Sequence, residues 1–190
     1  IGQLLKGLDK SSYGKNTIIV LWSDHGWHFG EKEHWHKRTL WEVCTRVPFI
    51  IVAPGVGKSK QVLNEPVSLI DIFPTLIELC GLTKKPELDG VSLVPVINNP
   101  KYSRKEPVIT VSEERHVSVV DRRYRLIRYN DGTEELYDRK NDPHEWRNRV
   151  TDPKLKEIKQ RLSAFVPGKW AKPAFTKKTF QFNPKTYRWK

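Results

Sequence analysis

The alternation of apolar and polar positions divides the chain into two styles of secondary structure. Over residues 1–100, apolar runs of strand length alternate with segments of helical spacing, a pattern typical of an α/β domain. Capping and turn residues place the expected elements as helices to about residue 12, around 38–44 and near 69–80, and strands at 16–22 and 48–53. The run 17–22 (TIIVLW) is rich in β-branched residues and uncharged, so we expect a strand buried on both faces of a parallel sheet.

Residues 107–138 follow another pattern. Short runs of strand-forming residues lie close together, and Asn130-Asp131-Gly132 between the last two signals a hairpin turn. We therefore expect a small antiparallel sheet here. A helix is expected from about residue 153 to 165, where apolar side chains recur at helical spacing.

These patterns predict three parts: an α/β portion at residues 1–105, a small α+β subdomain at 106–166 and a basic aromatic tail at 167–190. The tail holds seven of the 34 Lys and Arg residues and no acid, so it carries more than half of the net charge of +12. Its six interleaved aromatic side chains fit either polyanion binding by charge and stacking or packing onto the body of the protein. We favour packing, because exposing so many aromatic side chains is costly, and we expect no nucleic-acid partner.

The segment after the run 17–22 concentrates the chemistry of the chain. Residues 23–37 contain four of the six histidines, together with Asp24 and Lys37. Ligands of open α/β sheets bind at the carboxyl ends of strands. The carboxylate of Asp24 and the imidazole of His25 are adjacent and can reach one divalent cation from a tight turn. Lys37 would supply a point charge to an anionic oxygen, so a metal and a lysine together indicate an oxyanion ester as the substrate.

Several motifs occur in an order that carries a family resemblance. They are SDHGW at 23–27, GE at 30–31, WHK at 35–37, TLWE at 39–42, RVPFI at 46–50, SLIDIFPTL at 68–76, LDGVSL at 88–93, ELYD at 135–138 and NDPHE at 141–145. With these motifs the chain resembles the C-terminal portion of the type I sulfatases, over residues 1 to about 165, and within them the iduronate-2-sulfatase-like branch. The resemblance implies part of an alkaline-phosphatase-like α/β sandwich with a small C-terminal subdomain of antiparallel sheet and helix.

The resemblance also implies a site and an activity. In that family the Asp and His of the first motif bind a calcium ion and the later Lys contacts the sulfate, and the matching residues are Asp24, His25 and Lys37. The implied activity is hydrolysis of a sulfuric ester, with a sulfated carbohydrate as the expected substrate and other sulfate esters as alternatives. Lys37 is the catalytic candidate, because its charge would stabilise the sulfuryl oxygens.

Further residues of the segment are candidates for substrate contact. We expect Trp27 to stack on a sugar ring, with filling of the loop core as the alternative. His28 and His34 are expected to line the substrate pocket, although a loop histidine can also simply cover surface. Glu42 is expected to pair with Arg46 at i+4 rather than to act as a catalytic acid.

One departure from the family pattern decides how much of the site this chain supplies. The family nucleophile is a formylglycine made within a Cys/Ser-x-Pro-x-Arg motif, and neither Cys44 nor Cys80 lies in that context. We expect the formylglycine and the remaining metal ligands in an N-terminal portion of the same enzyme, which is then a partner of this chain. The chain alone is expected to be inactive. The resemblance suggests a periplasmic or secreted enzyme, or a lysosomal one in an animal, and no apolar run reaches the roughly twenty residues of a membrane span.

Two other functions remain open at this point. One is a phosphodiesterase or phosphonate hydrolase of the same superfamily, which the nucleophile motif would distinguish. The other is a non-enzymatic module that binds zinc and polyanions through His25-x-x-His28, His34-x-His36 and the basic tail. Structural zinc sites usually combine Cys and His at hairpin and helix spacing, and here both cysteines lie elsewhere. The sulfatase interpretation is therefore preferred.

Overall fold

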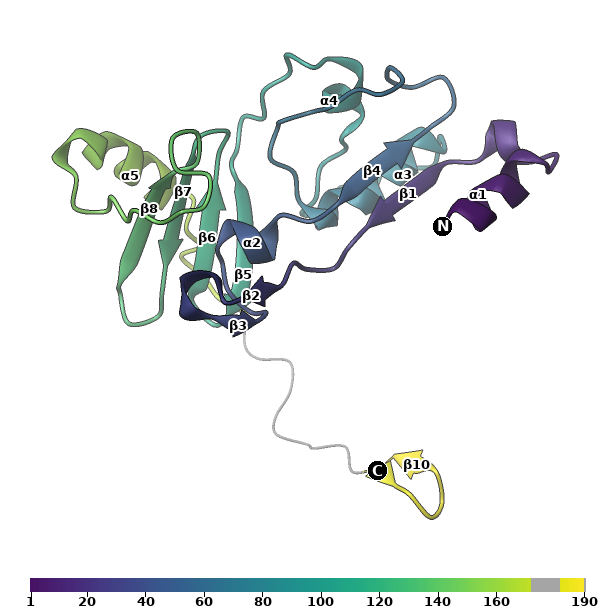
Figure 1. Ribbon diagram of the computed structural model, residues 1–190. Coiled ribbons are helices and arrows are strands. Elements are labelled where there is room, and N and C mark those ends of the chain that lie inside the picture. Colours follow the sequence, from purple (N-terminus) through teal and green to yellow (C-terminus); the bar gives the residue numbers. More distant parts are fainter. Residues whose placement is uncertain (172–181, 190) are drawn as a thin grey trace.

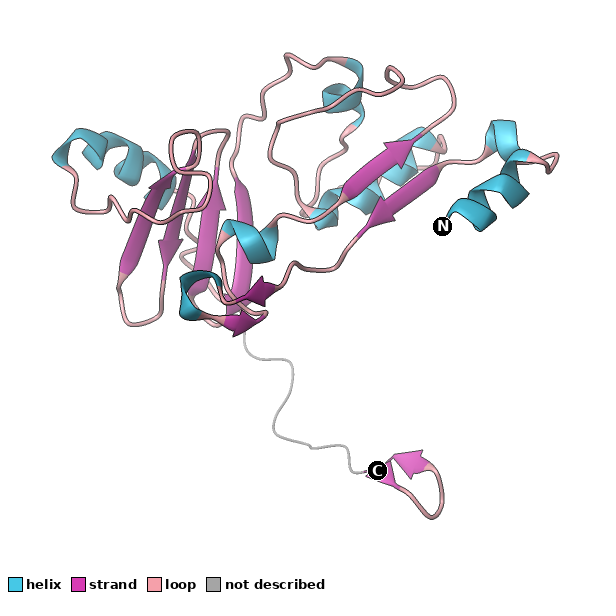
Figure 2. Cartoon of the chain, viewed as in Figure 1, coloured by secondary structure: helices cyan, strands magenta, loops and turns pink. Residues whose placement is uncertain are grey.

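The computed structural model of the protein describes residues 1–171 and 182–189. Helix α1 (Gly2–Asp9) and a four-stranded sheet lie at opposite ends, and strands β1 (Ile19–Trp22) and β4 (Phe49–Val52) run between them (Figure 1). Short connecting elements complete this half of the chain, namely η1 (Gly14–Asn16), α2 (Glu42–Thr45), η3 (Leu69–Asp71), α3 (Ile72–Leu79) and α4 (Val94–Asn98). Figure 2 shows how loops separate these elements.

The strand expected at 16–22 forms, but in a different setting from the one predicted. β1 pairs antiparallel with β4, with Ile19 opposite Val52 and Trp22 opposite Phe49, and no third strand joins them among the described residues. The side chain of Trp22 is 50% exposed, so the strand is not buried on both faces. An apolar β-branched run predicts a strand but not the direction of its neighbour. The connection from β1 to β4 spans residues 23–48 and includes α2, and β4 returns beside β1 in the opposite direction.

Helix α2 is shorter than the helix expected at 38–44. Arg38 has φ 74°, and the carbonyl of Leu40 accepts a hydrogen bond from Arg125 rather than from a helical amide. The strand expected at 48–53 and the helix near 69–80 are confirmed by β4 and by η3 with α3, which ends before Gly81 at φ 64°.

A buried carboxylate explains two of the sequence motifs as structural. Asp71 has no exposed surface and forms a capping box with Ser68 at the start of η3. Its Oδ1 accepts from the amide of Val91 at 2.9 Å, and Arg104 pairs with its Oδ2, the oxygen of the capping box, at 2.6 Å. A Cβ on Gly90 would lie 2.2 Å from a backbone oxygen of η3, so only glycine allows this approach. The motifs at 68–76 and 88–93 thus hold each other in place.

The expected antiparallel sheet is confirmed. Its four strands lie in the order β5-β6-β7-β8, and they are β5 (Val108–Glu113), β6 (His116–Val120), β7 (Tyr124–Arg128) and β8 (Glu134–Asp138). Gly132, at φ 86°, occupies the predicted hairpin turn between β7 and β8. One face packs against η4 (Pro153–Leu155) and α5 (Lys156–Ser163), the predicted C-terminal helix (Figure 1). The other face contacts Leu40 and Trp41 through Ile127 and Tyr137.

The expected packing of the tail aromatics holds for Trp170, which is partly buried against the core beneath α5, but not for Tyr187, which is 82% exposed. Strands β9 (Phe182–Asn183) and β10 (Arg188–Trp189) form a short antiparallel pair. Of the other expected aromatic contacts, those of Phe175 and Phe180 lie outside the described residues. No helix in the described part of the chain is long and apolar enough to cross a membrane. The division at residues 105 and 166 remains a prediction.

Candidate functional site

The loop between β1 and α2, residues 23–41, carries the predicted site residues, and we call it the site loop. It contains a two-stranded hairpin of β2 (His28–Phe29) and β3 (Trp35–His36), joined through η2 (Glu31–Glu33). Gly30, at φ 114°, makes the turn into η2. The hairpin folds the histidine-rich segment back on itself and brings residues far apart in the loop together.

Gly26 fixes the beginning of the site loop against α2. Its amide donates to the carbonyl of Cys44 at 2.7 Å, and a Cβ at this position would lie 2.0 Å from the carbonyl oxygen of Val43. A side chain is therefore excluded by the backbone of the neighbouring element.

The rest of the site loop has an unusual backbone. Lys32, Glu33, His36 and Arg38 have φ of 55°, 58°, 91° and 74°, all in the region that favours glycine. Such conformations cost on the order of 1–3 kcal/mol each and persist only where surrounding contacts determine them. They cluster at functional sites more often than elsewhere.

Three predicted site residues converge in this loop. The Nδ1 of His25 lies 2.8 Å from the carbonyl oxygen of Gly26, so Nδ1 carries the proton that is donated there and Nε2 keeps its lone pair. Lys37 Nζ donates to that Nε2 at 2.9 Å, across twelve positions of sequence. The Oδ2 of Asp24 lies 3.4 Å from the same Nε2, and the Asp24 side chain is 82% exposed. A carboxylate, an imidazole lone pair and an ammonium group thus share one exposed corner.

This corner fits a divalent cation in part. A carboxylate oxygen and a neutral imidazole with its other nitrogen bound to a carbonyl are both ordinary metal ligands. Among the described residues no group of three or more His, Cys, Asp and Glu side chains is arranged to hold a metal. Asp24 and His25 would therefore supply two ligands of a larger set, and the four-ligand zinc site of the alternative module does not form within the described residues.

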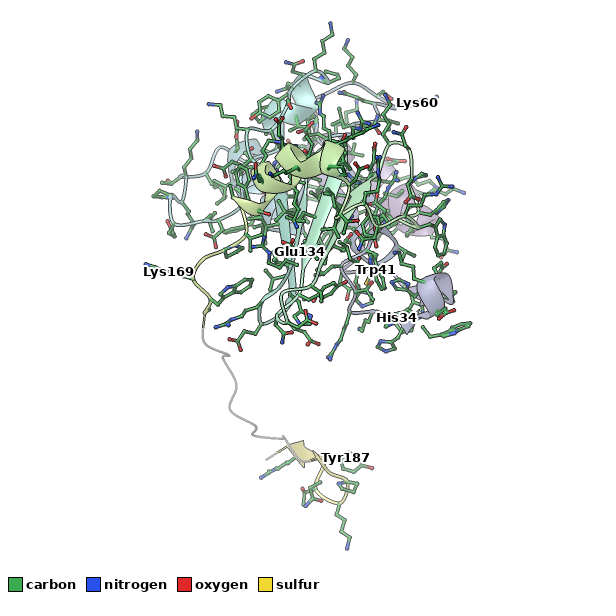
Figure 3. The ribbon with its side chains drawn as sticks, turned by 90° about the vertical axis from the view of Figure 1, so that its left-hand side faces the viewer. His34, Trp41, Lys60, Glu134, Lys169 and Tyr187 are labelled. Atoms are coloured by element: carbon green, nitrogen blue, oxygen red, sulfur yellow. The ribbon has the colours of Figure 1, made fainter. Side chains whose placement is uncertain are left out.

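Trp27 has an exposed ring beside this corner, whereas His34 is partly buried. The ring of Trp27 is 40% exposed and lies 4.6 Å from the ring of His36 and 6.2 Å from that of His25. His34 lies farther along, with its Nε2 3.4 Å from the carbonyl of Lys37. Figure 3 shows Trp41 between His34 and the four-stranded sheet. Trp27 is therefore placed to contact a ligand of the corner, and His34 is a more distant candidate.

His28 does not have the place expected of a substrate-contacting residue. Its side chain has no exposed surface, Nε2 lies 2.6 Å from the hydroxyl of Thr39, and Nδ1 lies 3.2 Å from the carbonyl of Glu31. Burial lowers the pKa of His28, which keeps the ring neutral. The imidazole joins two sides of the site loop, so we leave His28 out of the substrate-binding set.

Glu42 has stronger partners than the one predicted. The pair with Arg46 forms at 3.7 Å, but the Arg46 side chain is 78% exposed. Arg125 and Arg139 approach the Glu42 carboxylate at 2.5 Å and 2.9 Å, and these charges hold the pKa of Glu42 below its usual range against the opposing effect of burial. Helical spacing reveals only local partners, so no signal in the sequence pointed to arginines 83 and 97 positions away.

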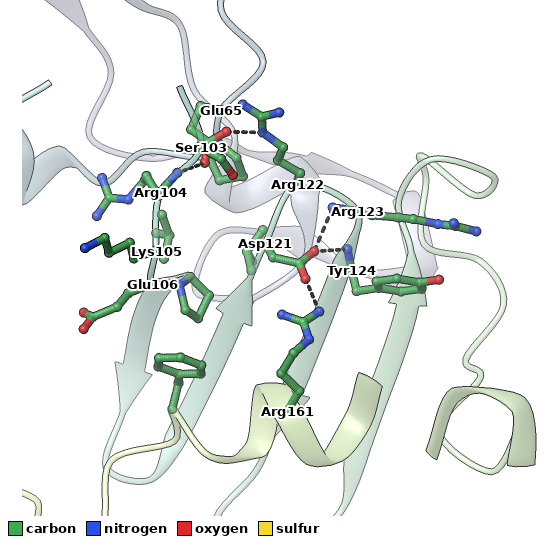
Figure 4. A pocket seen from close by; sticks show the side chains of 15 residues that line it. Glu65, Ser103, Arg104, Lys105, Glu106, Asp121, Arg122, Arg123, Tyr124 and Arg161 are labelled. Carbon is green, nitrogen blue, oxygen red and sulfur yellow. Dashed lines mark hydrogen bonds and ion pairs between the residues drawn. The ribbon is translucent and has the colours of Figure 1, made fainter. Parts of the chain in front are cut away.

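A cavity lies away from the site loop, beside β6 and β7. This cavity of about 380 Å³ is rich in arginine (Figure 4). Its arginines are paired within the protein: Arg161 with Asp121, Arg122 with Glu65, Arg123 with Asp138, and Arg104 with the buried Asp71. Because the arginine charges are neutralised internally, these side chains offer little attraction to an anionic substrate.

The comparison with known families gives the class of protein. Residues 30–168 match the family model described as N-sulphoglucosamine sulphohydrolase, C-terminal. The chain therefore belongs to the type I sulfatase family, and its fold is that of the alkaline-phosphatase-like members of that family.

Particular relatives agree with this assignment. A sulfatase of Formosa agariphila is 40% identical over 168 residues, which are 88% of this chain and 33% of that protein. A Delta 4,5-hexuronate-2-O-sulfatase of Bacteroides thetaiotaomicron is 33% identical over 83% of this chain and 35% of its own length. A solved structure of a 2-O GAG sulfatase superposes with a TM-score of 0.75 at 31% identity, covering 86% of this chain and 38% of that one. The chain thus spans about a third of the length of these relatives.

The alternative of a phosphonate hydrolase receives only a likeness of fold. The phosphonate monoester hydrolase of Agrobacterium radiobacter superposes with a TM-score of 0.69 at 23% identity. That similarity shows a shared architecture and no more.

Proposed function

We propose that this chain supplies the cation-binding and sulfate-binding part of the active site of a sulfatase that hydrolyses sulfate esters of a carbohydrate. The observation that carries the proposal is the convergence of Asp24, His25 and Lys37 at one corner, although Lys37 is twelve residues from His25. An ammonium group beside one carboxylate and one imidazole suits an anionic ester bound to a cation.

Asp24 and His25 would hold the cation, with calcium as the ion that the family resemblance implies. A bound divalent ion would polarise the sulfuryl oxygens. The bond from His25 Nδ1–H to the Gly26 carbonyl fixes the tautomer in which Nε2 carries the lone pair that would bind the ion. The nucleophile, a formylglycine by resemblance, would come from outside these 190 residues, as would the remaining ligands.

The geometry gives Lys37 a second property. The lone pair of His25 Nε2 accepts from Lys37 at 2.9 Å and cannot also bind a cation. Occupation of the cation site would therefore displace the ammonium group of Lys37 and leave it free to donate to a sulfuryl oxygen. Lys37 would then stabilise the negative charge that develops as the S–O bond breaks.

A sulfated carbohydrate is the substrate class that we favour. The named relatives include a Delta 4,5-hexuronate-2-O-sulfatase and a 2-O GAG sulfatase, which agrees with the iduronate-2-sulfatase-like resemblance. Trp27 offers an exposed ring near the corner on which a sugar could stack. A location outside the cytoplasm, where such polymers occur, is part of the same proposal.

The test uses the full-length protein with Lys37→Ala. We expect kcat and kcat/KM for a 2-O-sulfated disaccharide to fall together by about a hundredfold or more, with calcium content and melting temperature unchanged. Lys37→Arg should not restore the rate, because a planar guanidinium differs in shape from an ammonium group. Lys58→Ala, at an exposed position outside the site loop, is the control and should have no effect.

A substrate panel distinguishes the reaction classes. A sulfate ester, a phosphate diester and a phosphonate monoester are offered at equal concentrations, and kcat/KM should be highest for the sulfate ester. A clear preference for the phosphonate, or full activity of Lys37→Ala, would contradict the proposal.

A further inference from the structure

A buried arginine outside the site contacts the end of the site loop. Arg125 lies on β7 and its side chain is only 2% exposed. Its Nη1 donates to the carbonyl of Leu40 and to the hydroxyl of Ser118, both at 2.9 Å. Its Nη2 donates to Glu42 and its Nε to Glu145, both at 2.5 Å. The guanidinium group thus links two strands of the sheet to the residues that close the site loop.

Glu145 completes the same arrangement from the other side. Its side chain has no exposed surface, and its Oε2 accepts from the backbone amide of Glu42 at 2.8 Å while its Oε1 binds Arg125. Glu145 is itself held at φ 58°, a conformation that non-glycine residues seldom adopt. Backbone strain of this kind persists only where the surrounding contacts determine it.

Together Arg125 and Glu145 hydrogen-bond three groups of residues 40–42: the carbonyl of Leu40, the amide of Glu42 and the Glu42 carboxylate. Between these points the indole of Trp41 donates to Glu135 on β8 at 2.6 Å. A buried charge is poorly tolerated without its partner, so Arg125 and Glu145 each require the other and Glu42. The positions of residues 40–42 are consequently determined by the sheet.

The same hydrogen bonds also restrict the position of Lys37, because only a short piece of chain connects it to Leu40. Only Arg38 and Thr39 lie between Lys37 and Leu40. The hydroxyl of Thr39 is hydrogen-bonded to the buried His28, and Arg38 is in the left-handed region. A small displacement at residue 40 therefore moves the backbone of Lys37, and with it the ammonium group that lies 2.9 Å from His25. Displacements of about 1 Å near reacting groups can cost on the order of a hundredfold in rate.

We propose that Arg125 and Glu145 are positioning residues of the active site, which set the location of Lys37 by fixing residues 40–42 on the four-stranded sheet. The inference rests on the function proposed for Lys37. It assigns to the C-terminal sheet a part in catalysis that involves no contact with the substrate.

The experiment compares Arg125→Lys with Arg104→Lys in the full-length enzyme. Arg104 is the matched control, since it is 15% exposed, pairs with the buried Asp71 and makes no contact with the site loop in the described chain. Arg125→Lys keeps the charge but cannot make the four bonds of the guanidinium group. We expect Arg125→Lys to lower kcat/KM for the sulfated disaccharide by at least about tenfold, with calcium affinity unchanged. Arg104→Lys should lower the melting temperature by about as much as Arg125→Lys does, but without that loss of rate.

A double-mutant cycle with Lys37→Ala separates positioning from general structural damage. If Arg125 acts through Lys37, adding Arg125→Lys to Lys37→Ala should change kcat/KM by less than twofold. A full tenfold loss in both backgrounds would overturn the inference and leave the function of Lys37 intact. If Lys37→Ala itself has no effect, the proposed function fails instead, so the two failures are distinguishable.

A second variant covers the case in which Arg125→Lys does not fold. Glu145→Gln has nearly the same shape and keeps an oxygen for the amide of Glu42, but it removes the charge that Arg125 faces. It should show the same non-additive loss with Lys37→Ala. Additive losses in both series would contradict the inference.

Discussion

The site loop and the four-stranded sheet form opposite kinds of structure within one chain. In the sheet, Val117, Leu126 and Leu136 have no exposed surface, and the strands pair in register from β5 to β8 apart from one irregularity in β5. In the site loop, four non-glycine residues have positive φ, and the chemical groups at Asp24 and Trp27 face solvent. The form of the sheet is determined by its own buried core, whereas the conformation of the site loop depends on contacts with neighbouring elements.

This difference indicates how the protein keeps a strained site in one conformation. Arg125 of the sheet and Glu145, which follows β8 in the chain, bind the end of the site loop and the first residue of α2, and Lys32 Nζ donates to the hydroxyl of Tyr137 on β8 at 3.0 Å. The ammonium group of Lys32 also lies 4.5 Å above the ring of Trp41, and burial lowers its pKa. Rigid elements thus support a loop that carries the chemistry, an arrangement common in enzymes.

The largest effect is expected from Gly26→Ala, which should disrupt the conformation of the site loop without changing the four-stranded sheet. The added Cβ would lie 2.0 Å from the carbonyl oxygen of Val43, so either the site loop or α2 must move. We expect a loss of at least about a hundredfold in kcat/KM and more than about 3 kcal/mol of stability. Enzyme kinetics and urea denaturation of the full-length protein measure the two effects.

Gly7→Ala is the control for this substitution. Gly7 lies in α1 with no heavy atom within 4 Å of the position of a new Cβ. Alanine is the better helix former, so this variant should be unchanged in activity and stabilised by about 0.5–1 kcal/mol. Equal behaviour of the two variants would show that the contact of Gly26 with α2 does not shape the site.

A pair of substitutions on β7 sharpens the comparison between the two faces of the sheet. Leu126 belongs to the core under α5, and its neighbour Ile127 packs with Leu40 at the end of the site loop. Both are fully buried, so Leu126→Ala and Ile127→Ala should each cost about 2–5 kcal/mol. Only Ile127→Ala should also lower the kcat/KM of the folded enzyme, because only that cavity lies beneath the site loop.

The measurement is made below the melting temperature of the weaker variant, with activity normalised to folded protein. Similar catalytic losses in both variants would mean that the sheet acts on the site through global stability rather than through its contact with Leu40.

The sequence was sufficient for the regular parts of this fold and for the candidates of the site. Alternation and turn chemistry placed the four strands between residues 108 and 138, and the Asn-Asp-Gly turn was found correctly. Asp24, His25 and Lys37 were selected by residue type and family resemblance, and the structure brings them together. These signals are local, which is why a single sequence contains them.

The parts that escaped prediction depend on contacts distant in the sequence. The antiparallel pairing of β1 with β4 and the burial of His28 are set by where the chain returns, not by the residues themselves. The short α2 begins only at Glu42, because the carbonyl of Leu40 accepts from an arginine 85 positions away rather than from a helical amide. No periodicity encodes such a partner, so the sequence predicts a helix over residues 38–44, whereas residues 38–41 form part of the site loop and only 42–44 are helical.

The smallest expected effect concerns the neutral histidine inside the site loop. Burial lowers the pKa of His28, so the folded protein resists its protonation while the unfolded chain takes up a proton near the usual value of about 6.5. The unfolded state then binds more protons, and stability falls as pH drops below that value. His28→Gln removes the titrating group and keeps a polar side chain near Thr39. We therefore expect the stability of this variant to decline less steeply between pH 7 and pH 5 than that of the parent, as measured by urea denaturation at each pH.

His144→Gln, at an exposed position on the surface, should leave the slope as it is in the parent. A parallel decline in His28→Gln and the parent would show that acid acts on the loop through other groups, and the neutral imidazole would then be a consequence of packing with no influence on how the loop responds to pH.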